Sequence, residues 1–211
     1  MSNKGELYLI AAPSGAGKTS LMRALLERCP HLALSVSDTT RAPRAGEVDG
    51  EQYHFVDLES FRRDIEAGAF LEHADVYGNC YGTRRDRVEA LWAQGRDVLL
   101  EIDVQGAAQV QQRFPEVCSI FVLPPSMKAL SERLIQRGSD VPAVIERRLG
   151  EARNELEACG NFGWMVVNDD FDRALDQLLA IVTAWPLRRQ RQQHRIAKLL
   201  DESAGRSTIS D

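Results

Sequence analysis

Short runs of apolar residues alternate, along most of this chain, with longer segments in which apolar and polar residues are mixed. The apolar runs have the length of buried strands, and the mixed segments are typical of helices. Strands are expected at 7–11, 98–103, 119–123 and 164–168. Helices are expected at 20–26, 84–94, 105–114, 126–136 and 171–185, with a further long polar helix that begins at Asp140. This alternation predicts a mostly parallel sheet covered by helices on both faces.

One block of the chain departs from this alternation. Residues from about 32 to 56 are rich in Ser, Thr, Arg, Gly and Asp and contain only short apolar runs. The expected elements in and after it are a strand at 54–56, a helix over 58–67 that Gly68 stops, a strand over 70–77 and a turn at 78–79. We expect this block to form a small insertion with its own sheet.

The connection between the first strand and the first helix is the most informative stretch of the sequence. It consists of Ala12, Pro13, Ser14, Gly15, Ala16, Gly17, Lys18 and Thr19. Glycines between a strand and a helix let backbone N–H groups curl around phosphate, while the lysine reaches the β- and γ-phosphates and the hydroxyl holds Mg²⁺. Ala12 replaces the usual first glycine, a mild departure. This pattern predicts a nucleotide site without distinguishing a kinase from a switch or a motor.

Composition narrows the class of protein. The net charge of −5 over 211 residues gives no sign of a general nucleic-acid binder, so DNA and RNA are not expected as partners. No apolar run has the length of a membrane helix, and the first residues lead directly into a strand without a signal peptide. The four cysteines are scattered, and the four histidines lack metal-ligand spacing. We expect a cytoplasmic protein with free thiols.

A second group of residues suits a small phosphate. Arg41 and Arg44 lie three positions apart in a loop punctuated by proline and glycine, and Tyr53 follows closely. Two guanidinium forks can grip a phosphate dianion bidentately. An exposed basic turn without a ligand is the alternative that composition leaves open.

Six motifs together closely resemble the guanylate kinase family. They are residues 12–19, 35–47, 50–55, 77–83, 101–106 and 167–170. The resemblance implies an α/β fold of the P-loop NTPase type, with a parallel sheet flanked by helices, a small mixed α/β GMP-binding insertion and a lid. It also implies transfer of the γ-phosphoryl group of ATP to GMP or dGMP, with Mg²⁺ as cofactor. The implied parts are a core of 1–34 and 89–185, a GMP-binding subdomain of 35–88, a lid of 137–150 and a basic helical extension and tail of 186–211.

The resemblance also implies roles on the GMP side. The GMP phosphate is expected to contact Arg41, Arg44, Tyr53 and Tyr81. Guanine is expected to contact Glu72, which accepts from N1–H and the exocyclic amine, together with Ser37, Thr83 and Glu101. Two departures from the family pattern stand nearby. Cys80 replaces a frequent aromatic residue, and Asp38 stands where His or Ser is frequent.

On the ATP side, the implied catalytic groups are cationic: Lys18, Arg44, Arg137 and Arg148. Asn168 and Asp169 are expected near adenine. Asp103, at the end of an apolar strand, is expected to hold the water shell of the metal beside Thr19. The alternative is that Asp103 has only a general electrostatic role at the end of the strand.

Two other functions remain as alternatives at this stage. One is a related kinase with another small phosphorylated acceptor, and the other is a non-catalytic guanylate-kinase-like binding module. The basic C-terminal extension is expected to be a helix with a frayed end, although a tail that binds RNA or a partner has the same composition. Homo-oligomerisation is left open.

Overall fold

The computed structural model describes residues 5–76, 78–136 and 142–204. Within them a parallel sheet of five strands has the order β2-β7-β1-β8-β9. Its strands are β1 (Leu7–Ala11), β2 (Leu32–Ser35), β7 (Asp97–Glu101), β8 (Cys118–Leu123) and β9 (Trp164–Val167). Ile10 of the central strand lies opposite Glu101 on one side and Ile120 on the other. The predicted parallel sheet is confirmed.

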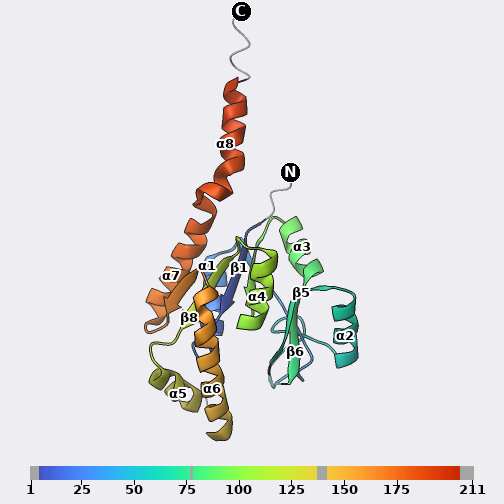
Figure 1. Ribbon diagram of the computed structural model, residues 1–211, viewed down its shortest axis with the longest axis vertical. Helices are drawn as coiled ribbons and strands as arrows, with labels where there is room; N and C mark the ends of the chain where they lie inside the picture. The colour runs from blue at the N-terminus through green and yellow to red at the C-terminus, as the bar shows by residue number, and fades with distance from the viewer. Residues whose placement is uncertain (1–4, 77, 137–141, 205–211) are drawn as a thin grey trace, which may run out of the picture.

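Helices cover both faces of this core sheet (Figure 1). Residues of α1 (Lys18–Arg28) and α7 (Phe171–Ala184) pack in one cluster with Tyr8 and Ile10. Residues of α3 (Arg85–Ala93) and α4 (Val104–Arg113) pack in a second cluster with Leu7 and Leu9. Successive residues of a strand point to opposite faces, so the fully apolar run of β1 is buried on both.

A second sheet of four strands lies within the residues expected to form the insertion. Its order is β4-β3-β6-β5, and its elements are β3 (Asp38–Thr39), β4 (His54–Phe55), α2 (Leu58–Glu66), β5 (Phe70–Val76) and β6 (Asn79–Arg84). The predicted strands and helix are confirmed here, as is the turn, where Gly78 has a φ of +75°. The sequence analysis missed β2, β3 and β6. These strands are short or rich in polar residues, and pairing with their neighbours defines them.

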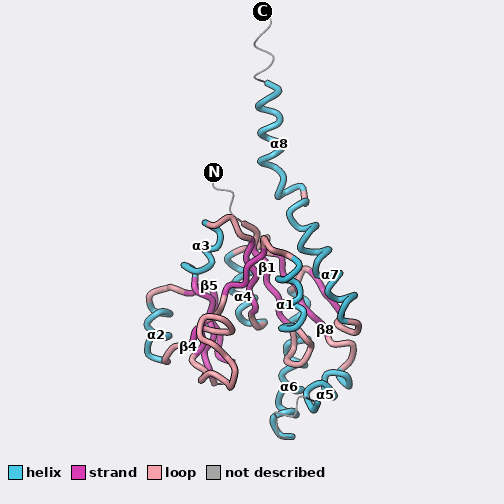
Figure 2. The backbone as a smooth tube through the Cα atoms, turned by 180° about the vertical axis from the view of Figure 1, so that it is seen from behind, coloured by secondary structure: helices cyan, strands magenta, loops and turns pink. Residues whose placement is uncertain are grey.

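Two further helices lie at the lower end of the core sheet, on the side away from α2 (Figures 1 and 2). They are α5 (Met127–Gln136) and α6 (Pro142–Ala158). The first of these was expected from residue 126, and the Oγ of Ser126 caps it by accepting from the Ala129 N–H at 3.0 Å. Residues 137–141 lie outside the described residues; they include Asp140, the expected start of the second helix, and Arg137, a predicted catalytic residue.

The C-terminal helix α8 (Arg189–Ala204) projects from the body of the molecule, as both views show. A short 3₁₀ turn, Trp185–Leu187, comes before it in the chain. Another such turn, Cys159–Asn161, follows α6. Glu6 anchors the base of α8, since its carboxylate pairs with Arg191 and accepts from the Trp185 indole, both at 3.2 Å. None of the described helices is long and apolar enough to cross a membrane.

Candidate nucleotide-binding site

Several of the predicted site residues lie at the carboxyl ends of the core strands. The phosphate-binding loop, residues 12–19, follows β1, Glu101 ends the neighbouring β7, and Asn168 follows β9. In open parallel sheets this edge is where ligands bind.

The conformation of the loop depends on two glycines. Gly15 and Gly17 have φ values of +96° and +92°, a region that side chains rarely allow. A Cβ on Gly17 would lie 2.3 Å from Nδ2 of Asn168. The Ala16 N–H donates to the Pro13 carbonyl at 3.0 Å and closes the turn.

Two side chains brace this loop from outside. The buried Asn168 amide donates to the Ala16 carbonyl at 2.7 Å. Arg133 of α5 donates to the backbone carbonyl of Asn168 at 2.9 Å and to that of Ala16 at 3.4 Å. The sequence analysis did not single out Arg133, because one arginine on a polar helix carries no local signal.

A cavity of about 460 Å³ opens beside the loop. It is lined by residues of the loop, α1, α5, the β9–α7 connection and the start of α7: Gly15, Gly17, Ser20, Arg133, Gln136, Asn168, Asp169 and Phe171. Asn168 and Asp169, expected near adenine, therefore both line it. Asp169 also pairs with Arg173 of α7. The role of the two residues toward a base stays a prediction.

Lys18 and Thr19 meet Glu101. The Lys18 ammonium lies 3.6 Å from the Glu101 carboxylate and donates to the Ile102 carbonyl at 3.3 Å. The Thr19 hydroxyl donates to Glu101 at 3.3 Å. Asp103 instead caps α4, where its carboxylate accepts from the Gly106 N–H at 2.8 Å. The sequence analysis assigned Asp103 to the metal and Glu101 to a base, whereas Glu101 is the carboxylate in contact with Thr19.

A second acid approaches the lysine from α6. Burial raises the pKa of Glu155 to about 7, while the positive charge of Lys18 opposes this rise, and Asp103 and Glu151 add to it. The sequence analysis missed Glu155, since it is one of several acids on a polar helix. Arg148, expected at the lid, lies half-buried on the same helix.

The predicted phosphate-gripping residues lie in and beside the second sheet, with Tyr81 in β6 and the others in neighbouring loops. Both oxygens of Glu47 accept from Nη2 of Arg41, at 2.8 and 2.9 Å. The Arg41 guanidinium lies 5.4 Å from the centre of the Tyr53 ring, and the Tyr53 and Tyr81 rings are 5.7 Å apart. Burial is the main cause that raises the pKa of Tyr53 to about 12. Glu47, which holds Arg41 in place, was not among the predicted site residues.

Arg44 lies at the exposed edge of this group. Its backbone N–H donates to Glu47 at 2.7 Å, and the Glu47 N–H donates to the Arg44 carbonyl at 3.1 Å. The loop is therefore closed on itself by Glu47, which leaves the Arg44 side chain at the surface. A carboxylate three residues after an arginine is a weak sequence signal for such a turn.

Glu72 of β5 is the most deeply buried carboxyl group among the predicted site residues, with 4% of its surface exposed. It accepts from the Thr83 hydroxyl at 2.5 Å, and that hydroxyl lies 3.5 Å from the hydroxyl of Ser37. Burial raises the pKa of Glu72 to about 7, Asp103 adds to the rise, and the Thr83 hydrogen bond opposes it. We call Ser37, Glu72 and Thr83 the buried triad.

The first turn of α4 lies against this carboxyl group. A Cβ on Gly106 would stand 2.3 Å from Oε2 of Glu72 and 3.3 Å from Oδ1 of Asp103. Gly106 therefore permits a close approach between the helix and Glu72. The sequence analysis quoted this glycine within a motif without giving it a role.

Taken together, the described residues form two cationic sites and a buried acceptor. Lys18 and the loop suit one phosphate chain, and Arg41 with its two tyrosines suits another. The buried triad offers oxygen acceptors that suit the N–H edge of a base. Such an arrangement can position two phosphorylated molecules for transfer between them.

Comparisons with known proteins agree on one family. A family model described as guanylate kinase matches residues 4–185. A guanylate kinase of Thiobacillus denitrificans is 53% identical over 201 residues, which are 95% of this chain and 96% of that protein. One of Alkalilimnicola ehrlichii is 52% identical over 201 residues, 95% of this chain and 99% of that protein. The crystal structure of guanylate kinase from Anaplasma phagocytophilum superposes with a TM-score of 0.74 at 35% identity, over 90% of each chain.

The pKa of Glu72 leads to a prediction about stability. Because this pKa rises from its usual 4.5 to about 7 on folding, the folded state holds a proton that the unfolded state releases. The free energy of unfolding should therefore fall as the pH rises through this range, by up to about 1.4 kcal/mol per pH unit. Glu155 also lowers the free energy of unfolding as the pH rises, because its pKa is raised in the same way. The test therefore compares wild type with Glu72→Gln by urea denaturation, so that the contribution of Glu155 is common to both. The variant should show a flatter pH dependence, and parallel curves would contradict the assignment.

The close approach at α4 leads to a second prediction. The variant Gly106→Ala should lower the free energy of unfolding by about 1–3 kcal/mol, the usual cost of overpacking, because its Cβ must displace Glu72. Gly150 is the matched control, since it is also helical but has open space around its Cβ position. Gly150→Ala should be neutral or stabilising by up to about 1 kcal/mol. Equal stability of the two variants in urea denaturation would show that the helix does not constrain Glu72.

Proposed function

Because this chain belongs to the guanylate kinase family and transfers the γ-phosphoryl group of ATP to GMP, we propose that its two cationic sites bind the two nucleotides. The phosphate-binding loop and Lys18 take the phosphates of ATP. Arg41, Arg44, Tyr53 and Tyr81 take the phosphate of GMP. The observation that carries this division is the buried triad, in which Glu72 and Thr83 belong to strands of the second sheet and Ser37 directly precedes its strand β3.

The triad suits guanine for a specific chemical reason. Guanine presents N1–H and an exocyclic amine side by side, and one carboxylate can accept from both. Adenine lacks this pair of donors, so a buried Glu72 would be left unpaired against AMP. An unpaired buried group of this kind supports discrimination by about 10⁴ or more. We assign Ser37 and Thr83 to the neighbouring polar atoms of the base.

Catalysis in this scheme rests on placement and positive charge. Phosphoryl transfer needs in-line alignment of the two phosphates and neutralisation of charge on the moving group. Lys18 and Arg44 would supply part of that charge, and Arg148, with Arg137 from outside the described residues, would add to it at the lid. The attacking oxygen of GMP is already ionised, so no general base is required.

The residues around Thr19 fit Mg²⁺. This cation prefers oxygen ligands and usually binds through one or two protein groups and substrate phosphates. The Thr19 hydroxyl and the Glu101 carboxylate, 3.3 Å apart, form such a pair of oxygens. When bound, Mg²⁺ would neutralise part of the negative charge of the ATP phosphates. We favour Glu101 over Asp103 for its water shell, because Asp103 already caps α4.

We further propose that the enzyme works in the cytoplasm. All four cysteines are free thiols, and Cys29 and Cys118 are buried, as suits a reducing compartment. ATP and GMP are its expected partners, without DNA or RNA. The comparisons lend no support to a different acceptor or to a non-catalytic module.

The function is tested by the formation of ADP. Purified protein with ATP and Mg²⁺ should form ADP rapidly with GMP and at a far lower rate with AMP. Lys18→Ala should reduce kcat by at least about 10³-fold, because it removes a charge that acts on the transferred group. Glu72→Gln should raise the KM for GMP by about 10-fold or more and leave that for ATP nearly unchanged. An unchanged KM for GMP would refute the triad as the guanine site.

The metal assignment is tested by comparing two acids. Glu101→Gln should raise the Mg²⁺ concentration needed for half-maximal activity by about 10-fold, since it removes a charged ligand near Thr19. Asp103→Asn is the control, because Asn also caps helices well. If Asp103→Asn has the larger effect on the Mg²⁺ titration, the original assignment of Asp103 to the metal is correct.

A further inference from the structure

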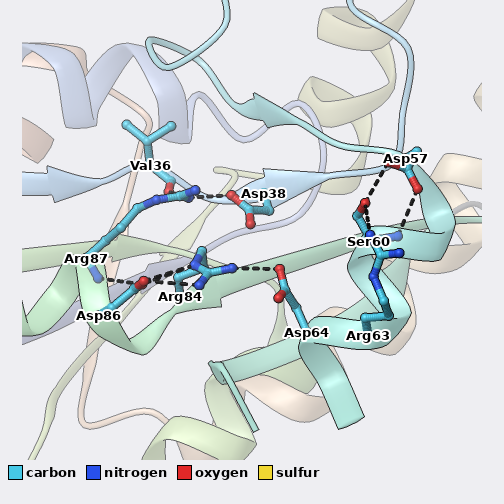
Figure 3. Close-up of polar contacts among 9 residues, drawn as sticks. All are labelled: Val36, Asp38, Asp57, Ser60, Arg63, Asp64, Arg84, Asp86 and Arg87. Atoms are coloured by element: carbon cyan, nitrogen blue, oxygen red, sulfur yellow. Dashed lines mark hydrogen bonds and ion pairs between the residues drawn. The ribbon is translucent and has the colours of Figure 1, made fainter. Parts of the chain in front are cut away.

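Arg87, in the first turn of α3, holds the backbone on both sides of Ser37. Its Nη1 donates to the Val36 carbonyl at 3.3 Å and also to the carboxylate of Asp38. Figure 3 shows the guanidinium reaching across from the helix to these two groups. Ser37 is the residue between them, so one side chain from α3 restrains both of its neighbours.

The ion pair with Asp38 fixes the position of Arg87 because the Asp38 carboxylate is buried. Only 2% of the Asp38 side chain is exposed, against 31% of that of Arg87. A buried carboxylate is stable only when it is paired, so Arg87 must stay close to β3. The rest of the segment is also tied down, since the Ser37 carbonyl accepts from the His54 N–H at 2.9 Å.

The contacts of Arg87 join the two chain segments that connect the core sheet with the second sheet. Residues 36 and 37 carry the chain from β2 of the core sheet to β3 of the second sheet. Helix α3 carries it back from β6 to β7. Arg87 therefore ties the outgoing connection to the returning one at the position of Ser37.

Arg84, three residues earlier, has different hydrogen-bond partners. It pairs with Asp64 of α2 at 2.6 Å and with Asp86 at 3.0 Å (Figure 3). Both arginines thus lie near the start of α3 in ion pairs, but only Arg87 bonds to the residues flanking Ser37. This makes Arg84 a matched control.

We propose that Arg87 is a positioning residue for guanine recognition, which acts by holding the Ser37 hydroxyl against Thr83. This inference rests on the proposed role of the buried triad. The Ser37 and Thr83 hydroxyls are 3.5 Å apart, at the outer limit of a hydrogen bond, so a small shift of the segment separates them. Thr83 in turn donates to Glu72, and Arg87 therefore supports the acceptor set without touching the base.

The test removes the pair without leaving a buried charge. Arg87→Gln combined with Asp38→Asn replaces both charged groups by neutral amides: Asn has the size of Asp, and Gln is shorter than Arg. The KM and Kd for GMP should rise by about 10-fold, within the range expected when a binding group is misplaced by about 1 Å. The KM for ATP and the melting temperature should stay close to wild type. Arg84→Gln should change the KM for GMP less than about twofold.

A double-mutant cycle separates positioning from a general structural role. In a Ser37→Ala background the paired substitution should have little further effect on the Kd for GMP, because the group that it positions is gone. Additive effects, an unchanged KM for GMP, or equal losses toward ATP and GMP would overturn the inference.

A further variant distinguishes failure of this inference from failure of the proposed site. If Glu72→Gln weakens GMP binding while the paired substitution does not, the triad stands and the role of Arg87 is refuted. If Glu72→Gln has no effect on the KM for GMP, the triad itself is misassigned, and the role of Arg87 falls with it.

Discussion

The loop after β1 must keep its backbone N–H groups turned toward an anion, and the surrounding structure serves this requirement. Two glycines adopt positive φ, and the Asn168 amide and Arg133 hold the Ala16 carbonyl from the opposite side. The bracing groups come from the end of β9 and from α5, so the loop geometry depends on the core sheet being assembled. A helix N-terminus alone would attract an anion, but bracing makes the curl of the loop a fixed feature.

Three cationic side chains of the molecule are each held by a neighbouring carboxylate. Glu101 lies beside Lys18, Glu47 holds Arg41, and Asp38 holds Arg87. Long cationic side chains lose much rotamer freedom when they bind, and a partner that already fixes them reduces that cost. An arginine whose position is set by one carboxylate can still offer its remaining N–H groups to a phosphate.

The proposed recognition of guanine depends on a different balance. Glu72 is placed where burial disfavours its charge, and the Thr83 hydroxyl only partly offsets this. A ligand with two N–H donors relieves the imbalance, and a ligand without them does not. The same burial that lowers the stability of the protein near neutral pH would thus support the proposed selectivity for guanine. Gly106 makes the arrangement fit, because α4 can approach the carboxyl group closely.

Local patterns in the sequence were sufficient for the buried strands, the phosphate-binding loop and most helices, because burial on two faces and glycine-dependent turns leave clear marks over a few residues. The motifs also identified the family, and the resemblance to it suggested the members of the triad, including Glu72, which lies outside the motifs. Tertiary structure alone decided β2, β3 and β6, because these segments become strands only through hydrogen bonds to neighbouring strands. It also decided the contacts of Glu101, Glu155 and Arg87. Arg87 and Asp38 are 49 positions apart, and no local pattern reports which charges the folded chain brings together.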